Sequence, residues 1–310
     1  FRSENGNQYL KASTFHYEAT SPDPGWQPQW DYTEPPADLS GAVDAGSCGP
    51  NLTWVLTDDG TLTIYGFGVM DDFYSASSHP WNTYDSQIKK LMIMPGVTYI
   101  GNYAFQYCAN LTEISLPDSV THIGGYAFYC CTSLSQVTLP AHLVVLSSYT
   151  FSGCSSLRSV ALPDTLRRIE SDAFSNCKSL AAVKLPNGLL SIGSSAFYGC
   201  QSLVSVTVPA GVTEIPGFAF LSCTSLQSVT LLGTKTLGFR SFSGCDSLTT
   251  LFLPECLTTV GDRAFEGCAS LSDVYYAGTE DQWKSVSISS YDNENQYLLA
   301  SAMHYQASPF

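Results

Sequence analysis

The stretch AFYGCQSLVSVTVP, residues 196–209, decides the fold because variants of it recur along most of the chain. Its cysteine belongs to a series spaced by 23 residues, with a single interval of 22. The series is Cys108, Cys131, Cys154, Cys177, Cys200, Cys223, Cys245 and Cys268. A phenylalanine lies three residues before each cysteine and a leucine three residues after it. The consensus LPxxLxxIGxxAFxxCxSLxxVx therefore recurs eight times between about residues 94 and 275, and this internal repeat dominates any prediction of the fold.

Each repeat carries one strand signal and one stop signal. In VSVTVP, Val206 and Val208 alternate with Ser205 and Thr207, which is the period of a half-buried strand. Pro209 ends the strand because proline cannot donate a ladder hydrogen bond. The LxxIGxxAF half predicts a short extended piece and a turn-like helical segment. One such unit cannot bury its apolar side alone, so we expect the repeats to stack into a curved solenoid.

The recurring cysteines have four possible uses: packing, a disulfide, a metal site or a nucleophile. Stacking brings all eight to the same inward-facing place, between the phenylalanine and leucine columns. Parallel side chains on neighbouring rungs disfavour disulfide geometry, and zinc sites use closely spaced cysteine pairs that the series lacks. We therefore predict buried thiols that act as small apolar groups and donate to a neighbouring loop carbonyl.

The repeat resembles the BspA-type leucine-rich repeat, whose pattern is LPxxLxxIGxxAFxxCxxL, over residues 94–276. The resemblance implies an α+β, mainly β, right-handed leucine-rich-repeat solenoid of about eight 23-residue repeats with N- and C-terminal caps. Departures are local: residues 231–240 are one residue short, and Ser147, Glu170 and Pro216 replace the usual glycine. The resemblance also implies a non-enzymatic bacterial protein, secreted or on the cell surface, that adheres to host or matrix proteins or to glycans.

The regions outside the repeats predict two caps. Residues 48–93 read as an N-terminal cap with a β-hairpin that turns at Asp58-Asp59-Gly60. Residues 94–276 form the solenoid, and residues 277–310 read as a C-terminal cap. In that cap Thr279 has the character of a helix N-cap, with acidic residues in the first turn.

The first residues repeat the last ones. Residues 7–19 match residues 295–307 at nine of thirteen positions. We therefore expect residues 1–19 to be the tail of a preceding repeat-domain cap, and the Pro- and Gly-rich residues 20–47 to be a linker. The chain begins at Phe1 without a visible leader, so we expect a fragment of a longer protein with tandem repeat domains.

Composition excludes several classes of partner. The net charge of −14 disfavours nucleic acid and anionic membranes, which both attract basic proteins. No apolar run approaches the ~18 residues of a membrane span, and we expect a monomer. The acidic residues Asp58, Asp59, Asp71 and Asp72 raise the alternative of calcium, although turn chemistry explains the first pair more simply.

Catalytic motifs are not apparent. Cys130 lies near His122 and His142 in the sequence, but a Cys–His nucleophile also needs an orienting third group. Cys130 occupies a place where other repeats have glycine, which predicts an exposed loop. We predict no catalytic residue, no metal and no cofactor. A passive spacer that presents a neighbouring domain is the main alternative to a binding protein, and a cysteine-dependent enzyme is a further one.

One position of the repeat changes its residue type along the chain. The position two before the phenylalanine is tyrosine in the first three repeats, and further tyrosines lie nearby. The candidate ligand-binding residues are Tyr99, Tyr103, Tyr107, Tyr126, Tyr129 and Tyr149. Tyrosine gives much contact area for little lost entropy, so an exposed ladder of these rings would suit recognition. The alternative is that the rings only cover one another or the N-terminal cap.

Overall fold

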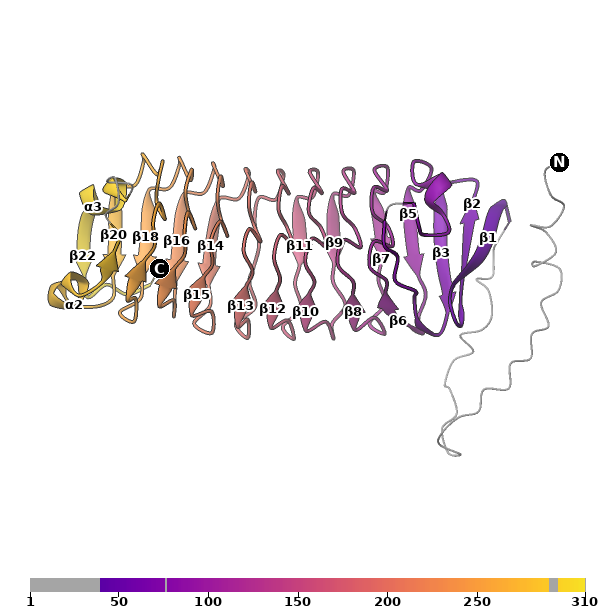
Figure 1. Cartoon of the computed structure of the whole chain (residues 1–310), viewed down its shortest axis with the longest axis horizontal. Helices are drawn as coiled ribbons and strands as arrows, with labels where there is room; N and C mark the ends of the chain where they lie inside the picture. Colours follow the sequence, from indigo (N-terminus) through magenta and orange to yellow (C-terminus); the bar gives the residue numbers. More distant parts are fainter. Residues whose placement is uncertain (1–39, 76, 290–294, 310) are drawn as a thin grey trace, which may run out of the picture.

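The computed structural model describes residues 40–75, 77–289 and 295–309 of the chain. Figure 1 shows a long stack of similar rungs, each made by one repeat, and this confirms the predicted solenoid. The tail and linker predicted for residues 1–39 lie outside the described residues, and the division into domains stays a prediction.

The main row of strands runs along one side of the stack. It contains β1 (Ala42–Gly49), β2 (Leu52–Thr57), β3 (Thr61–Gly66), β5 (Lys90–Ile93), β7 (Glu113–Ser115), β9 (Gln136–Thr138), β11 (Ser159–Ala161), β14 (Ser205–Val208), β16 (Ser228–Leu231), β18 (Thr250–Leu253), β20 (Asp273–Tyr276) and β22 (Ala302–Tyr305). The pairs β1–β2 and β2–β3 are antiparallel and the later pairs are parallel. In the repeat of Phe174 the expected strand is reduced to an isolated bridge between Ser159 and Ala182.

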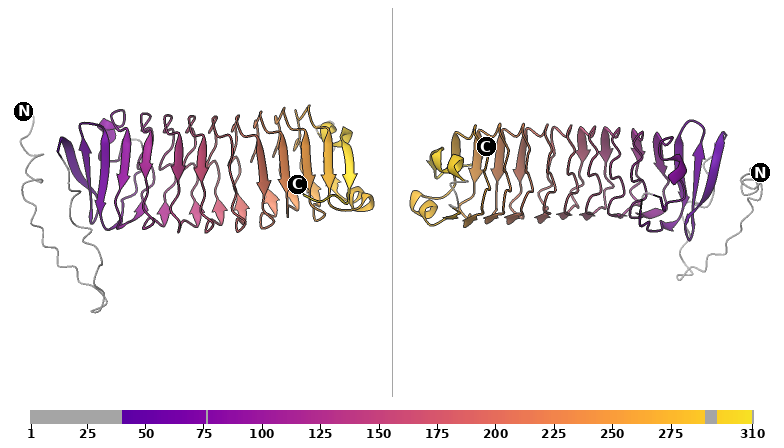
Figure 2. Two further views of the ribbon diagram at one scale, coloured as in Figure 1. Left: turned by 180° about the vertical axis from the view of Figure 1, so that it is seen from behind. Right: turned by 45° about the horizontal axis from the view of Figure 1, so that its top comes forward.

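A second row of very short strands follows the proline turn of each rung. It contains β4 (Gly68–Val69), β6 (Val97–Ile100), β8 (His122–Ile123), β10 (Val145–Leu146), β12 (Arg168–Ile169), β13 (Ser191–Ile192), β15 (Glu214–Ile215), β17 (Thr236–Leu237), β19 (Thr259–Val260) and β21 (Ser287–Ile288). The helical elements with described bounds are η1 (Asn82–Tyr84), α2 (Glu280–Lys284) and α3 (Gln296–Ala300). They belong to the regions that flank the repeats (Figure 2).

Turns, rather than helices, close the third side of each rung. Backbone N–H groups there donate to the next rung, as Phe105 N does to the Ala127 carbonyl oxygen at 2.8 Å. Rungs on this side are therefore spaced nearly as closely as the strands. A solenoid curves when one side is wider than the other, so the curvature expected from the sequence is wrong. The stack is nearly straight in both views of Figure 2.

The core consists of columns that run the length of the stack. All eight repeat phenylalanines are fully buried, and consecutive rings stack with centroids 5.2 to 5.8 Å apart. Seven of the eight cysteine thiols of the repeat column donate to the phenylalanine carbonyl of the preceding rung, as Cys200 Sγ does to Phe174 at 3.2 Å. The predicted thiol role is thus confirmed. The first, Cys108, instead faces Asp85 Oδ1 at 3.9 Å.

The N-terminal end begins earlier than the sequence indicated. Residues 42–47, assigned above to the linker, belong to β1 and pair with β2. Their sequence, AVDAGS, lacks the apolar alternation of a strand. They form a strand because β2, which is already paired with β3, offers its other edge to β1. The turn of that hairpin contains Asp59, whose carboxylate accepts from the Thr61 N–H at 2.9 Å.

At the C-terminal end, Thr279 caps α2 in a capping box with Gln282. The side chain of Asn295 then accepts the hydrogen bond that a further rung would have accepted from the Phe265 N–H. Its Oδ1 accepts from Phe265 N at 3.2 Å, and its Nδ2 donates to the Gly261 carbonyl oxygen at 3.1 Å. Asn295 is almost completely buried, so its amide ends the ladder without leaving the Phe265 N–H unpaired.

Candidate functional site

Three tyrosines from successive rungs stack directly on one another. The ring centroids of Tyr103 and Tyr126 are 4.7 Å apart and those of Tyr126 and Tyr149 are 4.4 Å apart, with the rings within 8° of parallel. We call these three residues the tyrosine ladder. The residues are half-buried and lie on the turn side of the stack. The repeat alone places them in register, because the same turn position recurs in every rung.

The backbone at this position is left-handed. Tyr103, Tyr126 and Tyr149 have φ values of 58°, 58° and 59°, a conformation that costs a non-glycine residue about 1–2 kcal/mol. Aromatic pairs are worth about 0.5–1.5 kcal/mol beyond their buried area. The stacking energy is thus of the same order as the backbone cost, although later rungs hold the same conformation without a tyrosine, as Ser195 does with φ 56°.

Two further predicted tyrosines join the ladder from the side. The Tyr129 ring lies 5.5 Å from that of Tyr126, and the Tyr107 ring lies edge-on to Tyr129 at 5.5 Å. Tyr107 is 47% exposed. Nearby in the chain, Gln106 is buried and its Oε1 has no hydrogen-bond partner. The structure therefore brings five of the six predicted tyrosines into one cluster.

Tyr99 is held differently. Its hydroxyl donates to Asp72 Oδ1 at 2.5 Å, and the same oxygen accepts from Asn102 N at 2.8 Å. Asp72 therefore organises the junction between the N-terminal region and the first rung. This is a structural use for one of the acidic residues that raised the calcium alternative.

The arrangement limits how a ligand can touch the ladder. Both faces of the Tyr126 ring are covered, one by Tyr103 and the other by Tyr149. A ligand therefore meets ring edges and hydroxyl groups rather than the face of the middle ring. These rings are not buried under residues 48–93, which would have removed them from any surface.

Carboxylates lie beside two of the predicted tyrosines, Tyr149 and Tyr99. Asp172 follows Tyr149 in the same column, and its negative charge is the main cause that raises the pKa of Tyr149 to about 12. Burial, and then the Asp72 carboxylate, raise the pKa of Tyr99. Both hydroxyls therefore remain protonated donors at neutral pH. Residues 91–157 contain no lysine or arginine, so no cation of this segment balances the two carboxylates.

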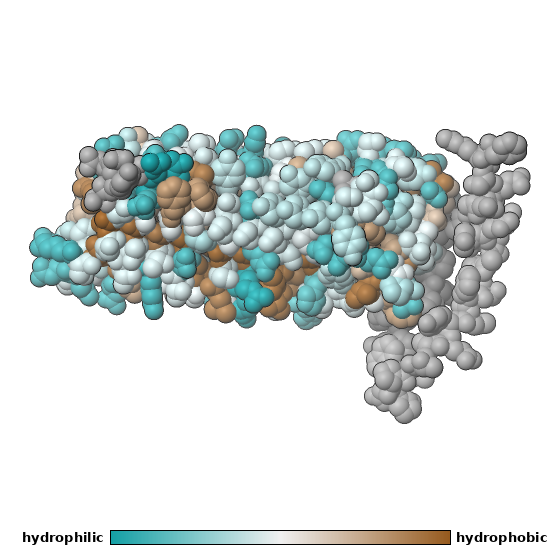
Figure 3. Space-filling view, in the orientation of Figure 1, coloured by the Kyte–Doolittle hydropathy of each residue, from teal (hydrophilic) through white to brown (hydrophobic). Residues whose placement is uncertain are grey.

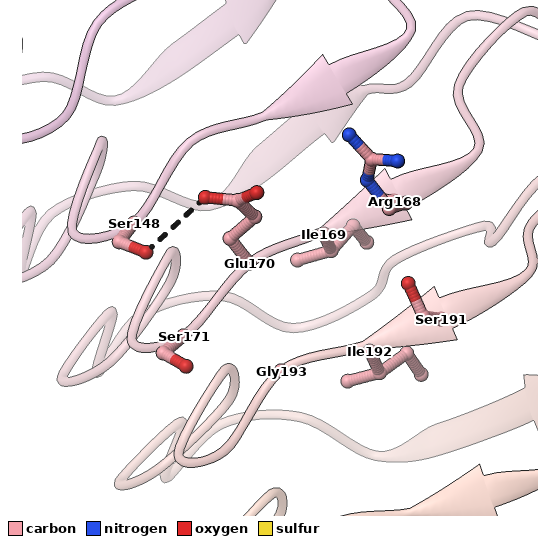
Figure 4. Close-up of a pocket in the computed structure, with 8 residues that line it drawn as sticks. All are labelled: Ser148, Arg168, Ile169, Glu170, Ser171, Ser191, Ile192 and Gly193. Carbon is pink, nitrogen blue, oxygen red and sulfur yellow. Dashed lines mark hydrogen bonds between the residues drawn. The ribbon is translucent and has the colours of Figure 1, made fainter.

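A shallow hollow of about 380 Å³ lies among the rungs that follow the ladder (Figure 4). Its lining comes from three successive rungs: Ser148, Arg168, Ile169, Glu170, Ser171, Ser191, Ile192 and Gly193. Ser148 precedes Tyr149 of the ladder, and Ser171 precedes Asp172. The sequence marked Glu170 only as a departure from the glycine consensus. The signal that would have pointed to a site is that departure together with the Arg167-Arg168 pair.

The remaining surface offers weaker candidates. On the face drawn in Figure 3, polar surface dominates and apolar residues form small separate patches, so this face presents no broad hydrophobic docking surface. The strand residues Ser115, Thr138, Ala161, Lys184 and Thr207 are exposed. Thr230, at the same position of β16, is buried because the bulky Phe252 is its partner on β18.

The cysteines outside the column do not form a catalytic arrangement in the described residues. Cys130 is half-buried with φ 57°, at the position where other rungs have glycine. Burial raises the pKa of the Cys130 thiol, whereas a nucleophilic cysteine needs a lowered pKa. His122 Nδ1 lies 2.9 Å from Thr121 Oγ1 and not against a thiol. Cys48 is buried, and Cys256 Sγ lies 3.7 Å from the Thr234 carbonyl oxygen.

Over the described ranges, no group of three or more His, Cys, Asp or Glu side chains is arranged to hold a metal ion. No helix in the part of the chain that the structure describes is long and apolar enough to cross a bilayer.

The columns of phenylalanine, cysteine and leucine define a leucine-rich-repeat solenoid. The model of the BspA type leucine rich repeat region matches residues 83–190 and 168–295, which is more than half of the chain, and the chain belongs to this family. Proteins of this family are typically surface binding proteins without enzymatic activity.

Solved structures with the same repeat are similar along most of the chain. A leucine-rich repeat protein of T. pallidum is 26% identical, with 85% of this chain and 100% of that chain covered and a TM-score of 0.49. A leucine-rich cell surface protein of Faecalibacterium prausnitzii is 22% identical, with 78% and 97% covered and a TM-score of 0.43. The pneumococcal vaccine antigen PcpA is 15% identical, with 76% and 82% covered and a TM-score of 0.36. No curated protein matches the chain.

Proposed function

We propose that this chain is a non-enzymatic binding module of a secreted or cell-surface bacterial protein, and that its ligand contacts the tyrosine cluster. Identical rungs present identical surfaces, so a specific site belongs where the repeat departs from its consensus. The tyrosines of the first three rungs are the clearest departure. Family membership supports the binding role, and the ligand class is a protein or a glycan.

The observation that carries this proposal is the accessible edge of the ladder. Tyr103, Tyr126 and Tyr149 present their edges in a row whose spacing is fixed by the rungs at 4.4 to 4.7 Å. Beside the row, Tyr107 is nearly half exposed. Binding energy in recognition surfaces is concentrated in a few aromatic and arginine anchors, and this rigid row loses little entropy when a ligand binds.

A binding screen with glycans and matrix proteins tests the proposal. Any hit is measured again with the double variant Tyr103→Ala/Tyr126→Ala, and we expect at least about a tenfold loss of affinity, as for aromatic anchors elsewhere. Tyr198→Ala is the matched control, because Tyr198 is a half-buried tyrosine of a later rung. Unchanged affinity in the double variant would overturn the assignment of the site.

A second measurement separates binding from folding. The triple variant Tyr103→Phe/Tyr126→Phe/Tyr149→Phe keeps the stacked rings and removes only the hydroxyl groups. It should unfold like the parent and lose the part of the affinity that depends on hydrogen bonds. A passive spacer, in contrast, would give no hit in the screen and no difference between these variants.

A further inference from the structure

The hollow beside the ladder holds two opposite charges apart. Arg168 and Glu170 are two residues apart, so their side chains leave the backbone on the same side, with Ile169 between them pointing to the core. Figure 4 shows both side chains on the same rung, with the Glu170 carboxylate turned towards Ser148 and the Arg168 guanidinium further along the strand. Within the described part of the chain, Arg168 has no ion-pair partner. The Arg168 guanidinium and the Glu170 carboxylate are thus two neighbouring charges that a ligand could contact.

Neighbouring rungs explain why the hollow is open. The position of Arg168 is occupied by Val145 and Ser191 in the adjoining rungs, and that of Glu170 by Ser147 and Gly193. These side chains are short or neutral, so neither charge is covered. Among the residues that the structure describes, the carboxylate accepts one long hydrogen bond, of 3.4 Å, from the Ser148 hydroxyl to Glu170 Oε2. Both charges therefore remain available to a ligand.

The lining has the chemistry of a site for an anionic sugar residue. The Arg168 guanidinium donates in a planar fork that matches a carboxylate or sulfate. On the same rung, Glu170 accepts hydrogen bonds from hydroxyl groups, and Ser148, Ser171 and Ser191 both donate and accept. A volume of about 380 Å³ lies at the small end of the ~300–1,000 Å³ range of ligand pockets. An open hollow of this size suits one residue of a longer chain better than a free small molecule.

We propose that the hollow binds an anionic sugar residue, with Arg168 on its carboxylate or sulfate and Glu170 on its ring hydroxyls, while uncharged residues of the same glycan lie along the tyrosine ladder, where no cation would balance an acidic group. This inference rests on the proposed function and narrows its ligand to an acidic glycan. Ser148 and Ser171 of the hollow directly precede Tyr149 and Asp172 in the chain, so the hollow and the end of the ladder are one residue apart on two successive rungs. A glycan that spans both would contact rings and charges together.

Binding of matched oligosaccharides to the whole chain tests the inference. The probes are a neutral galacto-oligosaccharide and the same oligosaccharide with one galacturonate or one sulfated residue, measured by calorimetry. We expect the neutral probe to bind at least about tenfold more weakly than an acidic one, since hydrogen bonds to a charged group contribute roughly 1.5–3 kcal/mol. Comparison of the two acidic probes shows whether carboxylate or sulfate is preferred.

Variants then locate the effect. Arg168→Gln should remove the preference for the acidic probe, and Glu170→Gln should weaken both acidic and neutral probes. Arg158→Gln is the matched control, because it makes the same change in net charge at another exposed arginine. Equal binding of neutral and acidic probes, or equal loss in Arg168→Gln and Arg158→Gln, would overturn the proposal.

Failure of this inference can be distinguished from failure of the proposed function. If Tyr103→Ala/Tyr126→Ala loses a ligand that Arg168→Gln still binds normally, the ladder is the site and the hollow is not. If neither variant affects a hit, both assignments fail. A protein hit that depends on the ladder alone would also reject the acidic glycan.

Discussion

The indole N–H of Trp81 donates a hydrogen bond to the carbonyl oxygen of Ala104 at 2.9 Å. In the next rung the equivalent carbonyl, that of Ala127, accepts from the backbone N–H of Phe105. Trp81 also stacks on the Phe105 ring with centroids 5.3 Å apart. One side chain thus supplies both the ring and the N–H of a rung that does not exist, much as Asn295 does at the other end.

Trp81→Phe should separate these two contributions. Phenylalanine keeps a ring against Phe105 but leaves the buried Ala104 carbonyl without its donor, so we expect a loss of about 1–3 kcal/mol in the free energy of unfolding. Denaturant unfolding measures it, with Trp283→Phe in the C-terminal region as a control for loss of an indole. An unchanged midpoint would show that the hydrogen bond does not stabilise the end of the stack.

The phenylalanine column should be most sensitive in the middle. Phe174 stacks between Phe151 and Phe197, and Phe174→Ala should cost roughly 3–5 kcal/mol. Phe265→Ala, in the last rung, should cost less, because terminal rungs open more readily. Chemical denaturation of both variants checks the order. Small and equal losses would mean that the rings do not form the core.

The thiol column makes stability depend on alkaline pH. Burial raises the pKa of Cys200 from 9.0 to about 12, so the folded protein holds this proton more tightly than the unfolded chain. Its contribution is fully present below pH 9 and is lost as pH rises towards 12, by about 1.4 kcal/mol per pH unit. Because the other column thiols are also raised, circular dichroism should show cooperative unfolding within this window. Cys200→Ala should shift the midpoint of this unfolding transition to higher pH, and an unchanged midpoint would contradict the argument.

Close contact between adjacent turns predicts a specific clash. Gly153 has φ +77°, and a Cβ there would lie 2.6 Å from Cys130 Sγ. Gly153→Ala should cost about 2 kcal/mol or more, from backbone strain and overpacking together. Gly68→Ala is the control, because Gly68 has φ +93° with open space around it. Cys130→Ala should recover part of the loss in Gly153→Ala, and additive effects in thermal unfolding would argue against the contact.

Reading the columns of the repeat was sufficient for the core and for part of the site. A fixed period places equivalent residues one above another, so the burial of Phe197, Cys200 and Leu203 and the stacking of the ladder could be predicted. The hollow could not, because its lining combines different positions of three rungs. In the sequence, Glu170 is notable only because it replaces the consensus glycine. Whether its side chain and that of Arg168 are exposed together depends on the fold of the strand.

The sequence by itself determined the stacking, since the period of 23 forces register between repeats that cannot bury their apolar sides alone. The tertiary structure decided the features that the repeat pattern does not specify: how the ends are closed, whether the stack curves and which side chains are exposed. The ends are closed by single side chains, Trp81 and Asn295, that replace the hydrogen bonds of absent rungs. The stack is straight because turns and strands repeat at nearly the same spacing. The exposure of the tyrosine edges and of the Arg168–Glu170 hollow likewise follows from which neighbours are small, and only the folded stack makes those residues neighbours.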